Sequence, residues 1–306
     1  MPPSLRRLAR RLQRPCVLRR AQHVAKLGVL ALLLAIGAGR SGAAGETPHP
    51  RRIVSMNACA DQYLIALADK DQIAALTRFA RDPNLSFYAE QAKAYPVSGD
   101  EPEAVLALKP DLVITNPYHA AGALAPLTGR ARVLELNSAE SFDEVVANTR
   151  IVAAAIGQTA RGEALVRAMQ ARVRAAGRRP LGGVAAYYQR GGYVAGPGSI
   201  MDDLMARAGL ANLARRLNSG ALGQLSLEQI VRRHPDFLIL TDERHPGQDE
   251  GDLMLDHPAL ARAEPPQRRL HVPQALTVCG GPSYPAALER LQAEANRARG
   301  AARRGR

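Results

Sequence analysis

The chain has 306 residues, of which 46% are hydrophobic, so it is long enough for two ordinary domains and apolar enough to bury a core in each. This composition excludes disorder for the bulk of the chain. The formal net charge of +13 suggests a nucleic-acid partner, but nine basic residues and no acid fall within residues 1–44. The rest of the chain has 32 basic against 28 acidic residues, and this near balance argues against nucleic-acid binding.

Residues 1–44 have the pattern of a secretory signal peptide. Basic residues come first, the apolar run 27–38 follows, and small residues stand after it, where a signal peptidase would cut. This run is too short to span a bilayer comfortably, which takes about 20 residues. We therefore expect a cleavable signal peptide and a periplasmic mature protein. An uncleaved membrane anchor is the alternative.

Residues 50–158 are predicted to form an N-terminal α/β lobe. A strand over residues 53–55 leads straight into an amphipathic helix over 61–68, which is how a doubly wound lobe opens. Ser141, followed three residues later by Glu144, predicts a capping box at the start of another helix. Further strands are predicted over residues 72–76, 112–115 and 132–136.

A long helix is predicted over residues 159–177, between the two lobes. Apolar residues recur at helical spacing on one face, and the other face is rich in arginine. No Gly/Ser-rich stretch adjoins this helix, so we expect a rigid connection between the lobes.

Residues 180–298 are predicted to form the C-terminal α/β lobe, followed by a frayed basic tail over 299–306. The glycine-rich stretch 189–199 lacks the lysine of a phosphate-binding loop, so it predicts a loop lining a cleft rather than a nucleotide site. Strands are expected over residues 184–188 and 270–272, and helices over 200–208, 257–263 and 283–298.

One helix-to-strand unit occurs twice, over residues 101–116 and 226–242. In each copy a glutamate in the first helical turn, Glu103 or Glu228, stands seven residues before a Pro-Asp pair, and a buried strand follows. The copies are 125 positions apart, which predicts two similar α/β lobes. Each glutamate could simply complement a helix dipole. Two exposed carboxylates at matching places could also form an anionic face for the arginines of a partner.

Ligands of doubly wound folds bind at the carboxyl ends of strands, so polar and aromatic residues there are candidate ligand contacts. Aromatic rings with polar tips can stack on a planar ligand, and arginines can bind its carboxylates or phosphates. Ordinary packing and solvation are the alternatives. The candidates are Asn57, Cys59, Arg78, Arg81, Tyr118, His119, Tyr188, Tyr193 and Ser199.

Removal of residues 1–44 takes Cys16 with it and leaves Cys59 and Cys279. Two cysteines in an oxidising compartment can pair as a disulfide. The alternative is two separate buried thiols.

The sequence contains no HExxH or CxxC motif, no close His/Asp cluster and no GxSxG elbow. We therefore expect no catalytic residues, no metal site built from protein ligands and no resident cofactor. An exported two-lobe enzyme acting on a small substrate is the main alternative function. A nucleic-acid or envelope binder that uses the arginine-rich termini is a weaker one.

The chain resembles the periplasmic binding proteins of ABC importers for cobalamin, ferric siderophores and haem, over residues 50–295. The strand 53–55, the block LALKPDLVI at 106–114, the helix that joins the lobes, the glycine-rich loop and the block SLEQIVRRHPDFLIL at 226–240 carry the resemblance. It implies two doubly wound α/β lobes bridged by a single long helix, with the ligand in the cleft between the lobes.

The resemblance also implies partners and roles. A cobalamin-type corrinoid or a ferric siderophore would be captured and delivered to an ABC import permease and its ATPase, by a monomer that is not an enzyme. Any cobalt or iron would belong to the ligand. Glu103 and Glu228 match the acids that dock on arginines of the permease in this family.

Overall fold

The computed structural model describes residues 49–99, 101–118, 124–241 and 250–304. The predicted signal peptide and the candidate His119 lie outside these ranges. Residues 48–306 form one compact unit, which carries both predicted lobes. Within the described ranges, no helix combines the length and the apolar character that crossing a membrane requires.

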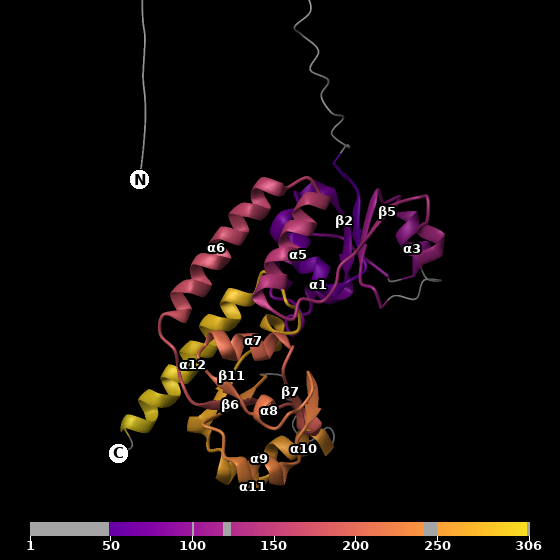
Figure 1. Ribbon diagram of the computed structural model, residues 1–306. Coiled ribbons are helices and arrows are strands. Elements are labelled where there is room, and N and C mark those ends of the chain that lie inside the picture. The colour runs from indigo at the N-terminus through magenta and orange to yellow at the C-terminus, as the bar shows by residue number, and fades with distance from the viewer. Residues whose placement is uncertain (1–48, 100, 119–123, 242–249, 305–306) are drawn as a thin grey trace, which may run out of the picture. The chain divides into compact units, whose positions relative to one another are not determined.

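The N-terminal half, residues 49–158, is built on a parallel sheet of five strands (Figure 1). Its elements are β1 (Ile53–Ser55), α1 (Ala58–Leu67), β2 (Ile73–Thr77), α2 (Ala89–Ala92), β3 (Val97–Ser98), α3 (Pro102–Ala107), β4 (Leu112–Thr115), β5 (Arg132–Glu135) and α5 (Phe142–Ala155). The strand order is β3-β2-β1-β4-β5, and every pair is parallel. Ile53 packs in the cluster that contains α1 and α5 residues, whereas its neighbour Val54 packs with Val105 of α3. Because both faces of the sheet are covered, β1 and β4 are buried along their whole length.

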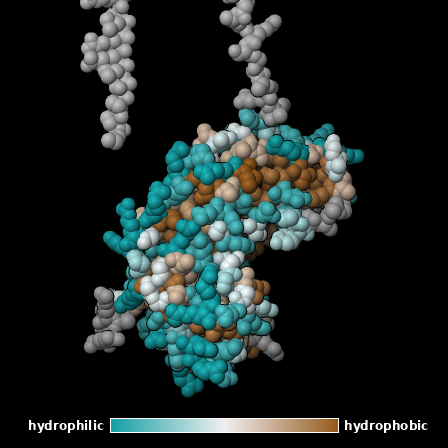
Figure 2. Space-filling view, in the orientation of Figure 1, coloured by the Kyte–Doolittle hydropathy of each residue, from teal (hydrophilic) through white to brown (hydrophobic). Residues whose placement is uncertain are grey.

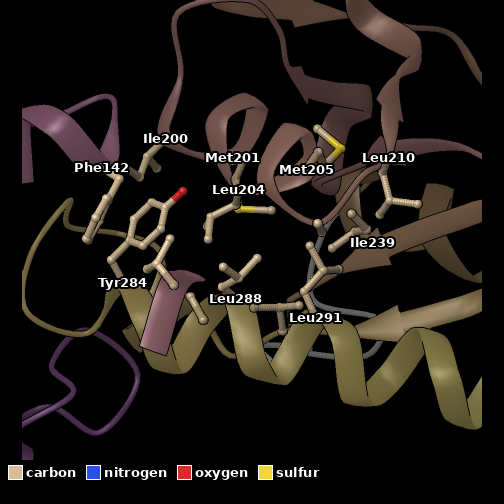
Figure 3. Close-up of a cluster of buried hydrophobic side chains, with 14 of the residues drawn as sticks. Phe142, Ile200, Met201, Leu204, Met205, Leu210, Ile239, Tyr284, Leu288 and Leu291 are labelled. Carbon is tan, nitrogen blue, oxygen red and sulfur yellow. The ribbon is translucent and has the colours of Figure 1, made fainter. Parts of the chain in front are cut away.

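The C-terminal half, residues 180–304, repeats this plan with four parallel strands. Its elements are β6 (Val184–Tyr187), β7 (Tyr193–Ala195), α7 (Ile200–Arg207), β8 (Ala211–Asn212), α8 (Leu213–Arg216), β9 (Leu222–Gln224), α9 (Leu227–Arg233), β10 (Phe237–Leu240), α10 (Glu250–Asp256), α11 (Pro258–Ala263), β11 (Arg269–His271) and α12 (Tyr284–Arg304). The strand order is β11-β10-β6-β8. Figure 3 shows one face of this sheet, where Ile239 of β10 packs with Met205 of α7 and with Leu288 and Leu291 of α12.

The two copies of the repeated unit have the same local geometry. In each copy the residue before the proline, Lys109 or His234, adopts a left-handed conformation, with φ of 48° or 45°. The helix therefore ends there, because a proline disfavours the right-handed helical region for the residue before it. The next aspartate fixes the neighbouring strand: Asp111 accepts a backbone N–H just before β1, and Asp236 accepts one at the start of β6, both at 2.7 Å. The repeat predicted from the sequence is a repeat of structure.

The predicted long helix is α6, Thr159–Gly177. Figure 1 shows it running past α5 towards α12. Glu163 of α6 forms an ion pair with Arg150 of α5 (2.7 Å), and Arg172 of α6 forms one with Glu289 of α12 (2.6 Å). Gly162 lies so close to α5 that a Cβ there would meet the Ala153 side chain at 2.4 Å. The helix is thus packed against both halves, as a rigid connection requires.

The glycine-rich stretch 189–199 is not simply a loop. Residues 193–195 form β7, which pairs antiparallel with β9 as a two-stranded ribbon. This ribbon follows the carboxyl end of β6. An isolated antiparallel bridge between Tyr188, the residue after β6, and Val194 connects β7 with the end of β6.

The capping box predicted at Ser141 is half right. The Ser141 hydroxyl accepts the Glu144 N–H at 3.3 Å, as an N-cap should. The Glu144 carboxylate instead accepts the N–H of Glu140 (2.6 Å), one residue before the cap.

The prediction that residues 299–306 form a frayed tail is wrong for the residues that the structure describes. Helix α12 continues to Arg304. The Arg299 guanidinium donates to the carbonyl oxygens of Leu181 and Gly182 and lies 5.4 Å from the centroid of the Phe237 ring. These contacts anchor the last turns of the helix to the amino end of the C-terminal sheet.

A buried carboxylate in the C-terminal half makes the stability depend on pH. The Glu264 side chain is fully buried, and neither of its oxygens has a hydrogen-bond partner. Burial raises the pKa of Glu264 to about 7, against the opposing effect of Arg268 and Arg269 and with a smaller contribution from Asp236. His234 Nδ1 lies 3.9 Å from Oε1. Because this pKa exceeds the ordinary value of 4.5, the contribution of Glu264 to stability is fully present below pH 4.5 and is lost as the pH rises through 7.

Replacing Glu264 with Gln should remove this loss. We expect a melting temperature roughly 3 °C above wild type at pH 8 and equal to wild type near pH 4.5, measured by differential scanning calorimetry. Glu294→Gln is the matched control, because buried Glu294 is paired with Arg290 and Arg297 and should lose stability at pH 8. An unchanged or lower melting temperature of the Glu264 variant at pH 8 would contradict the assignment.

Candidate functional site

The site is best located by the carboxyl ends of the parallel strands, where ligands of doubly wound folds bind. The sequence proceeds there from β1 into α1 through Asn57, and from β4 into Tyr118. In the C-terminal half it proceeds from β6 into the β7–β9 ribbon, and from β11 into the loop 278–283 before α12. Figure 2 shows the surface receding between the part built on the N-terminal sheet, above, and the part built on the C-terminal sheet, below.

Asn57 is the N-cap of helix α1 at this edge of the sheet. Its Oδ1 accepts the backbone N–H groups of Cys59 (2.7 Å) and Ala60 (3.3 Å), which caps α1. Asn57 also lines a cavity of about 60 Å³ between the two halves. Pockets that hold small organic ligands typically enclose about 300–1,000 Å³, so this cavity suits a few water molecules rather than a metal chelate. Its walls come from Asn57, Cys59, Tyr63, residues 136–140, Asn148, Ile200 and residues 278–280.

The two cysteines, whose pairing the sequence leaves open, form a disulfide. Cys59 lies in the first turn of α1 and Cys279 in the loop before α12, with their Cα atoms 5.3 Å apart. Next to this bond the Tyr63 hydroxyl donates to the carbonyl oxygen of Gly280 at 2.8 Å. Burial raises the pKa of Tyr63, so its hydroxyl stays protonated and able to donate. Cys59 therefore contributes a link between the halves at the predicted ligand-binding edge.

The two arginines predicted as ligand contacts differ in how their guanidinium groups are held. The Arg81 guanidinium donates to the carbonyl oxygen of Tyr95 at 2.6 Å, which holds it along the loop after β2. Arg78 is exposed, and its guanidinium lies 4.8 Å from the centroid of the Phe79 ring. Arg78 is thus the better placed of the two to meet an anionic group.

The prediction that Tyr188 contacts the ligand is wrong. Tyr188 is completely buried and belongs to the core behind the C-terminal sheet. Its hydroxyl donates to the carbonyl oxygen of Leu225 at 3.2 Å. Burial raises its pKa to about 12. It packs the fold and does not face a ligand.

Two other predicted tyrosines are exposed at strand ends. Tyr118, after β4, has 84% of its surface exposed, and Tyr193, in β7, has 45%. Leu222 of β9, which the sequence did not single out, is 71% exposed. The ribbon pairs Tyr193 with Gln224 and Ala195 with Leu222, so Tyr193 and Leu222 lie on the same face. Large apolar side chains are thus exposed at the carboxyl edge in both halves.

Ser199 is engaged in local structure. Its hydroxyl donates to the carbonyl oxygen of Gly196 (2.7 Å) and accepts the N–H of Asp202 (3.2 Å), which caps α7. A ligand could reach it only through the remaining lone pair.

Glu103 and Glu228 occupy equivalent positions in the two halves. Each is the second residue of its helix, α3 or α9, and each is exposed. Glu228 has 82% of its side chain exposed and lies 3.7 Å from Arg232, one helical turn away. Such an exposed pair contributes little to stability, so both carboxylates are available to a partner.

Residues 53–264 match the family described as "Periplasmic binding protein". A cobalamin-binding protein of Halobacterium salinarum is 29% identical over 207 residues, which cover 62% of this chain and 54% of the relative. The chain therefore spans about half the length of the curated relatives that it matches.

Solved structures agree in fold. The periplasmic haem-binding protein RhuT from Roseiflexus sp. RS-1, in apo form, is 26% identical with a TM-score of 0.65, over 81% of this chain and 99% of that one. A periplasmic haem-binding protein from Pseudomonas aeruginosa is 26% identical with a TM-score of 0.62, over 80% of this chain and 92% of that one. The two α/β halves joined by α6 are thus an architecture shared with solute-binding proteins.

Proposed function

Because the chain belongs to the periplasmic binding protein family, we propose that it is a receptor that binds a metal chelate between its two halves and delivers it to an ABC importer. Binding proteins of this family take small solutes and work with ABC importers. The family match over residues 53–264, which includes both copies of the repeat, is the observation that carries the proposal. On this account the chain is a monomeric carrier and not an enzyme, and residues 1–44 direct it to the periplasm.

The proposed ligand is a cobalamin-type corrinoid, a ferric siderophore or haem. Relatives described as binding cobalamin and haem support this class. The exposed rings of Tyr118 and Tyr193, one from each half, support a ligand with an extended apolar face. Arg78 at the end of β2 supports one that also carries an anionic edge.

The delivery step would use the acids of the repeat. Glu103 and Glu228 lie on equivalent helices of the two halves, so a permease with two arginine clusters could bind both carboxylates at once. Such docking would engage both halves of the receptor at the same time. The ATPase would then act on the permease and not on the receptor.

Replacing both tyrosines tests the binding site. We expect Tyr118→Ala with Tyr193→Ala to weaken binding of the chelate about tenfold or more, because each ring would cover apolar ligand surface. Isothermal titration with cyanocobalamin, haemin and a ferric hydroxamate would measure it. Ile151→Ala is the control, since Ile151 is 46% exposed but lies within helix α5, outside the segments that directly follow the strand ends. Equal affinity of the double variant and the control would place the ligand elsewhere.

A further inference from the structure

Polar contacts between the two halves meet around the small cavity. The Ile200 N–H, at the start of α7, donates to the Glu140 carboxylate of the N-terminal half at 3.2 Å. Nearby, the Phe142 N–H donates to Asp203 Oδ2 at 3.0 Å. With the Tyr63–Gly280 hydrogen bond, these contacts define a seam between the halves. Glu140 and Ile200 line the same cavity as both cysteines, so the disulfide belongs to this seam.

An apolar cluster lies beside the seam. Phe142 of α5 packs against Tyr284 of α12, with ring centroids 5.0 Å apart. Figure 3 shows these two rings with Ile200 at one end of the cluster of buried side chains in the C-terminal half. The start of α5 is thus seated in the core of the other half. Non-directional packing of this kind lets rigid bodies rotate by small amounts while the contact persists.

The disulfide is a different kind of contact, because it is covalent and must be reduced before the two cysteines can separate. Cys59 follows the carboxyl end of β1, and Cys279 lies between β11 and α12. The loop that carries Cys279 is closely packed: a Cβ at Gly280 would lie 1.9 Å from the Ala139 carbonyl oxygen. Any rotation that draws α1 away from this loop must stretch the Cys59–Cys279 bond.

We propose that the Cys59–Cys279 disulfide limits how far the two halves can separate at the seam, and that its reduction speeds ligand exchange. The first part stands on the geometry alone, and the second rests on the proposed function. With the bond intact, the hydrogen bonds of the seam stay formed. With the bond reduced, the seam opens about the apolar cluster and exposes the carboxyl edges of both sheets.

The chemistry needs a dithiol reductant. One of its thiolates attacks a sulfur of the disulfide and forms a mixed disulfide, releasing the other cysteine as a thiolate, which takes up a proton. The second thiolate of the reductant then closes its own disulfide and frees the remaining cysteine. Two electrons pass to the protein, which gains two thiols, and the reductant becomes a cyclic or protein disulfide. Cys59 is half-buried and Cys279 is buried, so attack at Cys59 is the more accessible route.

Amide hydrogen exchange measured by NMR tests the limit on opening without any ligand. The Phe142 and Ile200 N–H groups donate across the seam. The Thr77 and Val184 N–H groups are matched controls, because each donates to an aspartate within its own half. On reduction with dithiothreitol, and in the Cys59→Ser/Cys279→Ser variant, we expect exchange at the two seam amides to accelerate about tenfold more than at the controls, because the seam opens locally whereas the controls report only the loss of global stability. Unchanged seam amides, or equal acceleration of all four, would overturn the proposal.

Ligand release tests the second part. Haemin and cyanocobalamin serve as probes, with haemin release followed by transfer to excess apomyoglobin and cobalamin release by stopped-flow dilution. We expect the dissociation rate to rise about tenfold on reduction. An unchanged rate would refute the effect on exchange. Failure of the oxidised protein to bind either probe would count against the proposed ligand class, and the amide exchange would still decide whether the disulfide restrains the seam.

Discussion

Uptake of the ligand is expected to stop when Glu103 and Glu228 are both replaced by alanine, while ligand affinity stays at the wild-type value. Both carboxylates are exposed and lie in the first turns of equivalent helices, so their loss would remove the proposed docking contacts without disturbing a core. A charge-assisted contact to arginine contributes about 1.5–3 kcal/mol, so losing two of them would weaken docking by two orders of magnitude or more. Growth dependent on the imported chelate, together with a binding titration, measures both quantities.

The matched control is Glu90→Ala with Glu135→Ala, which removes two exposed acids outside the repeated unit. This control should import the ligand normally. The single variants should be intermediate, because each keeps one docking contact. Normal uptake by the Glu103/Glu228 double variant would contradict the docking role.

Replacing both disulfide cysteines with serine is expected to lower the free energy of unfolding by about 4 kcal/mol. The bond closes a loop of 220 residues, and a cross-link of that span restricts the unfolded chain strongly. Urea denaturation followed by circular dichroism measures the change. The result should be the same whether the bond is removed by mutation or by reduction, apart from the small cost of the serine hydroxyls.

Tyr63→Phe is the matched control for this experiment. It removes the hydrogen bond to Gly280 and leaves the covalent bond, so it should cost about 1 kcal/mol. If the double cysteine variant lost no more stability than Tyr63→Phe, the disulfide would not be a principal link between the halves.

The sequence predicts much of the fold because its signals are local. The proline after Lys109 and after His234 ends each helix, and the apolar runs that follow can only be buried strands. A capping box of Ser226 and Gln229, with both of its hydrogen bonds, starts α9 and is likewise a local signal. The long helix 159–177 follows from its apolar face, and the structure places it over the same residues, Thr159–Gly177.

The features that the sequence does not predict depend on distant parts of the chain. The β7–β9 ribbon joins two three-residue strands that are separated by α7, β8 and α8, so no hairpin turn in the sequence indicates their pairing. Its formation decides that Tyr188 is buried while Tyr193 and Leu222 are exposed. The end of α12 is likewise set by carbonyl groups near residue 181, more than a hundred positions earlier.

In the candidate site, too, some features are set by local sequence and others by distant parts of the chain. The placement of the candidate residues just after strands, and of Glu103 and Glu228 in equivalent first helical turns, follows from sequence spacing. Asn57 and Ser199 were predicted as ligand contacts but cap helices, because a side chain that follows a strand and precedes a helix serves the helix first. The pairing of Cys59 with Cys279 could not be settled from the sequence, because it depends on how the two halves meet.

The central claim is that this chain binds a metal chelate between its two halves. Isothermal titration of the oxidised protein with cyanocobalamin, haemin and a ferric hydroxamate tests it most directly. The account predicts saturable binding of at least one of them with one ligand per chain, weakened when Tyr118 and Tyr193 are replaced. No saturable binding of any of the three would contradict it.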